Sequence, residues 1–313
     1  MLSEWRSSEG MRGTVTTQHA TQRPSEASGT LTIGGDLKVY RLGFGAMRIT
    51  GEGIWGPPAN KDEAIAVLRR ALDLGINLID TADSYGPDVS ESLIAEALYP
   101  YPADLVIATK GGLLRTGPGE WPQDGSPAHL RAALEGSLRR LRLDRIDIYQ
   151  FHRPDPKVPF ADSVGELAKM RAEGKIRHVG LSNVTVEQLS QARDIVPIVT
   201  VQNRYNLADR ESEGMTAARS EEMIDICARE GIGFIPWNPL STGDLARPGG
   251  PLDEIARRKN AQPSQVALAW LLRRSATMLP IPGTSSTRHL EENAEGATLT
   301  QEEFDAIDRG SKS

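Results

Sequence analysis

The sequence is poor in cysteine, and its single thiol, Cys227, allows no internal disulfide bond and no cysteine-rich metal site. No apolar run approaches the roughly 20 residues of a membrane-spanning helix, and no signal-peptide core follows the first residues. A strong excess of one charge is also missing, since 36 basic side chains face 42 acidic ones and the formal charge is -6. Such mild acidity argues against electrostatic binding to nucleic acid or to an anionic membrane. We therefore expect a reduced, cytoplasmic protein with neither of these partners.

The first 30 residues differ in composition from the rest of the chain. They include ten serine or threonine residues between Ser3 and Thr30, few large apolar residues and no sustained period. We expect a flexible tail over residues 1–30, with a leader of unknown use as the alternative. We expect the remaining residues, 31–313, to form a single domain.

Short apolar runs alternate with polar segments from residue 31 onward. The first two runs predict a hairpin over Leu31–Val39, with Gly34 and Gly35 in a two-residue turn. Eight further runs have the length and composition of buried strands. They are Leu42–Met47, Asn77–Asp83, Leu105–Lys110, Ile146–His152, Ile176–Asn183, Ile198–Asn206, Ile232–Leu240 and Met278–Thr284.

The segments between these runs have the spacing and the starts of helices. Apolar residues recur three and four residues apart between Ala64 and Leu72, a stripe that should face a sheet. Asn60, Thr185 and Thr300 each precede Glu or Gln by three residues, which is the spacing of a capping box. Beyond this first helix, we expect helices at about 90–99, 127–141, 161–173, 186–194, 220–230, 263–274, 287–295 and after 300.

Eight strand–helix units with nearly continuous apolar strands indicate parallel strands that are buried on both faces. A chain of this length with eight such units closes most naturally into an α/β fold of the TIM barrel type, (β/α)8. A doubly wound sheet is the alternative.

Reactive side chains lie at the predicted carboxyl ends of the strands, where the active site of such a barrel forms. Asp80, Tyr85, Lys110 and His152 follow three successive strands. A buried ammonium beside a phenol should favour phenolate, and a nearby carboxylate should keep that ammonium charged. The group has a proton donor but no nucleophile with its own base, which points to redox chemistry supplied by a cofactor. No pair of histidines has zinc-ligand spacing, so we expect no metal.

The order and spacing of these residues are similar to those of a known family. The stretch Asp80-Thr-Ala-Asp-Ser-Tyr85, Lys110 and the stretch Phe151-His152-Arg153-Pro154 resemble the aldo-keto reductases in order and spacing, and the resemblance covers residues 36–310. It implies that Tyr85 is the general acid–base, that Lys110 lowers the pKa of Tyr85 and that Asp80 pairs with Lys110. By the same resemblance His152 orients the substrate carbonyl.

The resemblance also implies a set of cofactor-binding residues. Ser182, Asn183 and Gln202 would hold the nicotinamide carboxamide, and Trp237 would stack on its ring. The pyrophosphate and the adenosine phosphate would lie along Pro239, Leu240, Ser241, Ile281, Gly283, Thr284, Ser285, His289, Glu292 and Asn293. Many family members carry Lys or Arg in this last segment, where this chain has Gly283 and His289. The hydroxyls, a helix N-terminus and Arg288 can still bind phosphate, so we favour NADPH over NADH.

Three segments make the bacterial pyridoxal reductases, or pyridoxine 4-dehydrogenases, the most similar subfamily: Gly51–Pro58, Glu96–Tyr101 and Gln265–Ser275. We therefore expect reduction of an aldehyde or ketone, with pyridoxal as the most specific candidate. Another aromatic carbonyl compound, or a regulatory protein that binds the cofactor with little turnover, is the alternative. A glycosidase would need two flanking carboxylates, which these strand ends do not supply.

Two tryptophans fall in predicted loops on the same rim as Trp237. Trp55 and Trp121 are candidates for an aromatic substrate wall, although they could also pack the loops themselves. The loop from Gly111 to Gly125 is rich in Gly and Pro, which fits a mobile rim segment. Arg115 within it could contact polar substrate groups, but a solvated charge is the simpler interpretation.

Overall fold

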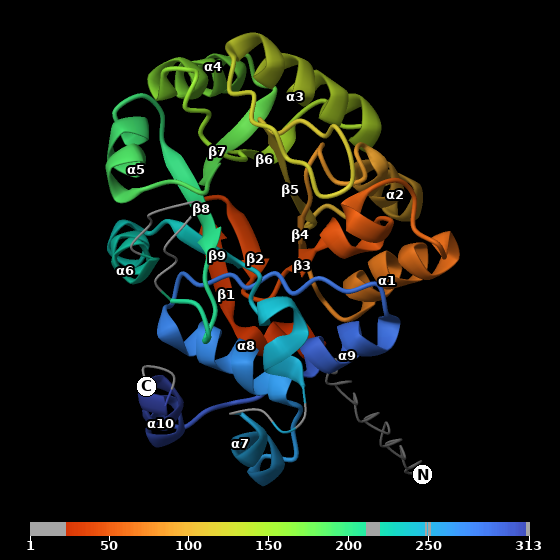
Figure 1. The fold of residues 1–313 in the computed structure, drawn as a ribbon, viewed down its shortest axis with the longest axis vertical. Helices are drawn as coiled ribbons and strands as arrows, with labels where there is room; N and C mark the ends of the chain where they lie inside the picture. The colour runs from red at the N-terminus through yellow and green to blue at the C-terminus, as the bar shows by residue number, and fades with distance from the viewer. Residues whose placement is uncertain (1–22, 211–219, 248, 250–251, 311–313) are drawn as a thin grey trace, which may run out of the picture.

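The computed structural model describes residues 23–210, 220–247, 249 and 252–310. Its centre is a curled sheet of seven parallel strands that neighbour one another in sequence order, surrounded by helices (Figure 1). The strands are β3 (Phe44–Gly45), β4 (Leu78–Asp80), β5 (Val106–Gly111), β6 (Ile146–Phe151), β7 (Ile176–Ser182), β8 (Ile198–Arg204) and β9 (Gly233–Trp237).

The predicted eighth strand, Met278–Thr284, closes the ring without forming a regular ladder. Two backbone hydrogen bonds join its N-terminal side to Phe234 of β9, and two others join it to Gly43 and Gly45 at β3. Two prolines in the segment lack N–H donors, which explains why it shows only one β-bridge, between Phe234 and Met278. The barrel fold predicted from the sequence is confirmed.

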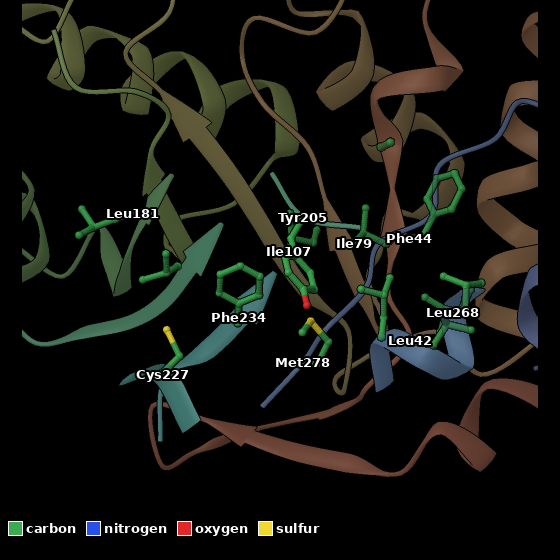
Figure 2. Close-up of a cluster of buried hydrophobic side chains, with 14 of the residues drawn as sticks. Leu42, Phe44, Ile79, Ile107, Leu181, Tyr205, Cys227, Phe234, Leu268 and Met278 are labelled. Carbon is green, nitrogen blue, oxygen red and sulfur yellow. The ribbon is translucent and has the colours of Figure 1, made fainter. Parts of the chain in front are cut away.

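The alternation of side chains along each strand separates two apolar layers. Outward residues such as Ile79, Ile107 and Phe234 pack against the surrounding helices, as Figure 2 shows for part of this outer layer. Inward residues of the same strands, including Leu78 and Val106, form a second core inside the barrel. Closer to the carboxyl ends the inward positions become polar, at Asp80, Lys110 and Gln150, so the reactive side chains lie directly above this inner apolar core.

The predicted hairpin closes the other end of the barrel. Strands β1 (Thr30–Ile33) and β2 (Leu37–Tyr40) pair antiparallel, and their buried side chains join the inner core. The loop holds three residues rather than the two predicted, since Ile33 pairs with Leu37 and Asp36 lies between them beside two glycines of positive φ. The Asp36 carboxylate lies 2.6 Å from His178 at the start of β7, which fixes the hairpin to the barrel.

The predicted tail over residues 1–30 is wrong for its last eight residues. Pro24–Ser28 form a short 3₁₀ helix, and buried Ser25 bonds the carbonyl of Leu74 through both its N–H and its hydroxyl. These are contacts to residues about fifty positions away, which composition does not reveal. Residues 1–22 lie outside the described residues.

The helices follow the predicted positions closely. Ser126 caps its helix by accepting from the N–H of His129, and Thr185 forms a complete capping box with Gln188. A six-residue helix, α7, was not predicted, and within the described ranges no helix has the length and apolar character needed to cross a membrane. The helices are α1 (Lys61–Asp73), α2 (Val89–Leu98), α3 (Pro127–Leu141), α4 (Phe160–Ala172), α5 (Val186–Arg193), α6 (Ser220–Glu230), α7 (Asp253–Arg258), α8 (Pro263–Arg274), α9 (Thr287–Glu295) and α10 (Gln301–Gly310).

Candidate active site

Lys110 forms the centre of a buried polar network at the carboxyl ends of β4 and β5. Its ammonium lies 2.5 Å from a carboxylate oxygen of Asp80, 2.8 Å from the Thr81 carbonyl and 3.3 Å from the Tyr85 hydroxyl. These three acceptors use the three N–H bonds of the ammonium. Lys110 is wholly buried, and so is nearly all of Asp80. The structure therefore brings together three of the four residues that the resemblance implied, in the expected order of contact.

The second oxygen of the Asp80 carboxylate is held by two amides from neighbouring strands. Gln150 of β6 and Gln202 of β8 each donate to it over 2.8 Å. Gln150 was not among the predicted residues. A signal for it existed, because Gln150 lies two positions before His152 and two after the apolar Ile148, and so on the same inward face of the strand.

Burial decides the protonation of Tyr85. Withdrawal from water raises the pKa of its phenol above the ordinary value of 10, and the adjacent Lys110 ammonium opposes this without reversing it. Lys110 therefore lowers the pKa of Tyr85, as the resemblance implied, but by less than burial raises it, so the net shift is upward. For Lys110 itself, burial favours the neutral amine, but Asp80 and Tyr85 outweigh it and raise the pKa. At neutral pH the site therefore holds a protonated phenol beside an ammonium.

His152 follows β6 and lies against Tyr85. The two rings meet edge to face with their centroids 5.8 Å apart, and the His152 Nδ1 atom lies 3.4 Å from the Ser84 hydroxyl. Burial, with the positive charges of Lys110 and Arg153, lowers the pKa of His152 well below its ordinary value. The imidazole is consequently neutral, with one N–H available as a donor.

A second polar group lies on the neighbouring strand ends and contains the predicted nicotinamide residues. Asn183, directly after β7, donates to the His152 carbonyl and to the Ser182 hydroxyl, each over 3.0 Å. Its side-chain oxygen accepts the indole N–H of Trp237 at 3.1 Å, which fixes the orientation of that ring at the end of β9. Gln202 links this group to the first one through Asp80.

The loop after β9 contains the predicted residues Pro239, Leu240 and Ser241. Three non-glycine residues here, Asn238, Ser241 and Thr242, have φ between 50° and 59°. Such left-handed residues cost about 1–3 kcal/mol each and gather at ligand clamps. The Asn238 side chain holds the turn by accepting from the N–H of Thr242 at 2.7 Å.

The remaining predicted cofactor residues lie in the closing segment and on α9. Gly283 approaches Gly45 so closely that a Cβ atom at Gly283 would lie 2.5 Å from the Gly45 carbonyl oxygen, so a larger residue would displace the strand end. The other positions follow the chain up to and along the first turns of α9, with Ser285 and His289 exposed and Ile281, Thr284 and Asn293 buried. Glu292 is half-buried and accepts from exposed Arg288 over 2.8 Å.

The start of α9 is already partly occupied by side chains of this chain. Ser286 caps it, and the Glu63 carboxylate at the start of α1 accepts from both the N–H and the hydroxyl of Thr287. The Glu63 side chain therefore bonds to α9, whereas its spacing from Asn60 predicted a capping box at the start of α1. Asn60 still caps α1 by accepting from the N–H of Glu63. The predicted adenosine end is therefore built jointly by α1 and α9, which Figure 1 shows side by side.

The two predicted substrate tryptophans both lie beside Tyr85. Trp121 meets the Tyr85 ring edge to face at 6.4 Å between centroids, and Trp55 forms a parallel bridge with Gly86. Arg115 lies between the two indoles, with its guanidinium carbon 3.6 Å from the Trp121 centroid and 5.5 Å from that of Trp55. Arg115 is half-buried, so the interpretation as a solvated charge is wrong. Among the described residues, no three His, Cys, Asp or Glu side chains lie together as a metal site.

Comparison with known proteins agrees with this geometry. Residues 41–312 match the Aldo/keto reductase family. An uncharacterized oxidoreductase of Schizosaccharomyces pombe is 51% identical over 288 residues, which cover 91% of each chain. Pyridoxine 4-dehydrogenase of Escherichia coli is 44% identical over 291 residues, which cover 90% of this chain and 98% of its own.

Solved structures give the same result at lower identity. The glycerol dehydrogenase from Gluconobacter oxydans has a TM-score of 0.78 at 29% identity, and the match covers 90% of this chain and 95% of the other. An aldo/keto reductase from Klebsiella pneumoniae in complex with NADP and acetate has a TM-score of 0.75 at 26% identity, with the same coverage. The resemblance read from the sequence is confirmed, and the chain is an oxidoreductase of the aldo/keto reductase family.

Proposed function

We propose that this protein reduces an aldehyde or ketone to an alcohol with NADPH, and that Tyr85 supplies the proton. The observation that supports this most directly is the buried sequence of contacts from Asp80 through Lys110 to the Tyr85 hydroxyl. This series of contacts fixes the phenol of Tyr85 in place and holds the positive charge of Lys110 beside it. An oxygen that gains negative charge next to this group is stabilised and protonated.

Each residue has a definite task in this proposal. The Tyr85 hydroxyl donates its proton to the carbonyl oxygen, and the Lys110 ammonium stabilises the phenolate that remains. Asp80 keeps Lys110 charged and oriented, and the two glutamines hold Asp80. Neutral His152, edge-on to Tyr85, donates one N–H to the same carbonyl oxygen and so orients it. Because the network is nearly closed to solvent, these dipoles act without competition from water.

The residues around the site fit a nicotinamide cofactor. The Ser182 hydroxyl accepts from Asn183, which leaves its O–H for the carboxamide, and the indole of Trp237 is held at the end of β9 as a stacking surface. The left-handed loop at Asn238–Thr242 and the start of α9 suit the phosphates. When bound, NADPH supplies the hydride. The Klebsiella pneumoniae relatives, one in complex with NADP and one with NADPH, support this choice.

Pyridoxal is the substrate that we propose first. The relative from Escherichia coli, at 44% identity over nearly its whole length, is a pyridoxine 4-dehydrogenase. Half-buried Trp55 and Trp121 line the approach to Tyr85 and suit a flat aromatic ring. Another aromatic aldehyde or ketone is the alternative.

The test follows NADPH oxidation with pyridoxal and a panel of aromatic and aliphatic aldehydes and ketones, and compares NADPH with NADH. We expect turnover with NADPH, and the highest kcat/KM on the panel for pyridoxal. A higher kcat/KM for another aromatic carbonyl would replace pyridoxal as the substrate. Tight NADPH binding with no turnover on any carbonyl would overturn the proposed reaction in favour of a regulatory protein that binds the cofactor.

A further inference from the structure

The guanidinium of Arg115 is saturated by backbone carbonyls. Arginine has five N–H donors, and each one meets a carbonyl oxygen here. The acceptors, at 2.7–3.3 Å, are the carbonyls of Glu120, Ile54, Ser84, Gly53 and Gly117. No donor of Arg115 is left to bind a carboxylate or phosphate group of a substrate, which removes the role suggested by its position in the sequence.

These five carbonyls come from three different loops of the rim. Gly53 and Ile54 lie in the loop after β3, Ser84 in the turn that carries Tyr85, and the other two in the loop after β5. Gly53 and Ile54 both have positive φ, at 67° and 56°, a conformation that a β-branched residue rarely adopts. The bonds to Arg115 help to hold this unusual turn.

The same guanidinium also fixes the tryptophans. Its carbon lies over the Trp121 ring, 3.6 Å from the centroid, which is a close cation–π contact, and it lies 5.5 Å from the centroid of Trp55. Trp121 in turn meets the Tyr85 ring edge-on. The loop bearing Trp121 is also closed at its base, because Leu113 and Gln123 pair there as an antiparallel bridge.

From these contacts we infer that Arg115 is a positioning residue for the substrate: it joins the three rim loops and sets Trp55 and Trp121 as a preformed aromatic wall beside Tyr85. Arg115 acts through the tryptophans and does not touch the reacting atoms. The substrate class that this wall favours is a flat aromatic carbonyl compound, recognised by stacking and not by charge. The kinetic part of this inference rests on the proposed function.

The kinetic test compares Arg115→Met with the parent protein on pyridoxal, pyridoxal 5′-phosphate and a small aliphatic aldehyde. Loss of a preformed wall removes binding that is equal in ground and transition states, so KM should rise with little change in kcat. We expect KM for both aromatic aldehydes to rise about tenfold, and KM for the aliphatic aldehyde to change by less than about threefold. Arg69→Met is the matched control, because exposed Arg69 donates to the Ala97 carbonyl away from the rim and should alter neither value.

Two kinetic results would overturn the inference. A rise in KM confined to pyridoxal 5′-phosphate would show that Arg115 binds the substrate anion directly, and unchanged KM values for all three would show that it positions nothing. Should Arg115→Met fail to fold, Arg115→Lys serves the same test. Lysine keeps the charge but offers three donors on one nitrogen, so the KM for pyridoxal should rise above that of the parent by less than about tenfold, and an unchanged KM would overturn the inference.

A spectroscopic measurement tests, without any turnover, whether Arg115 holds Trp121 in place. In Arg115→Met, acrylamide should quench tryptophan fluorescence more strongly, because Trp121 loses the guanidinium that covers one face. The increase should disappear when Trp121 is also replaced, in the Trp121→Phe background. If the parent protein reduces no carbonyl compound, the proposed function fails, but the quenching still tests whether Arg115 holds Trp121. Equal quenching with and without Arg115 would overturn that role.

Discussion

The Lys110 ammonium lies 2.5 Å from the Asp80 carboxylate, and solvent reaches almost none of either side chain. Two opposite charges in such a place depend on one another, since removal of one leaves the other buried and uncompensated. Tyr85, Gln150 and Gln202 all bond to this pair. The pair should therefore affect the stability of the folded protein as well as the reaction.

Replacing Lys110 by methionine should reduce the free energy of unfolding by about 3–5 kcal/mol, because the Asp80 carboxylate then remains buried without its cation. Urea unfolding measures this. The control is Lys61→Met, which breaks a pair with Glu96 that is about half exposed at both ends and should cost about 1 kcal/mol or less. Adding Asp80→Asn to Lys110→Met should restore part of the loss. Equal stability of the two methionine variants would contradict the account.

The pH dependence of kcat for reduction should show a broad plateau. Reduction requires the protonated phenol, so activity is lost only as pH rises through the pKa of Tyr85, which burial places above 10. No step should appear near 6.5, the ordinary pKa of histidine, because burial keeps His152 neutral well below that value. Steady-state rates with saturating NADPH between pH 5 and 10 should show no step near 6.5 and at most the beginning of a decline at the alkaline end. A titration near neutrality would show that one of these groups changes charge in the working range.

Arg288 should contribute to the preference for NADPH. It is exposed on the first turn of α9 and pairs with Glu292, so its effect on a 2′-phosphate is limited by solvent. We expect Arg288→Gln to raise the KM for NADPH by about three- to fivefold and to leave the KM for NADH unchanged. Arg139→Gln, at an exposed position on α3, is the control. The same rise with both cofactors would remove Arg288 from 2′-phosphate recognition.

Much of the fold could be predicted from the sequence because its signals are local. Apolar runs separated by caps such as Asn60 and Thr185 fix the strands and helices to within a few residues. The candidates Tyr85, Lys110 and His152 follow from the rule that barrel chemistry lies at strand ends. The eighth strand was also correctly placed, although its prolines reduce its pairing to a single bridge.

The parts that were missed depend on contacts between distant residues. Residues 23–30 have the composition of a tail, and only the bonds of Ser25 to Leu74 make them part of the domain. Arg115 gives no periodic signal, and its acceptors at Ile54 and Ser84 lie 61 and 31 residues away. The lowering of the Tyr85 pKa by Lys110 could be predicted from their positions, whereas the larger upward effect of burial could not, because the depth of burial is not visible in the sequence.

If the Tyr85 hydroxyl supplies the proton, its removal should slow carbonyl reduction, and kcat of Tyr85→Phe measures this. This variant keeps the ring that packs on Trp121 and His152 and removes only the hydroxyl. Tyr101→Phe serves as the control, because it removes a hydroxyl that donates to the Leu141 carbonyl, and both residues precede the N-terminal ends of strands β5 and β6, away from the carboxyl ends that carry the site. We expect Tyr85→Phe to lower kcat by a factor of about 10² to 10⁴ with NADPH affinity unchanged, while Tyr101→Phe retains full turnover. Retention of more than about a tenth of the parent kcat by Tyr85→Phe would contradict this role of the Tyr85 hydroxyl.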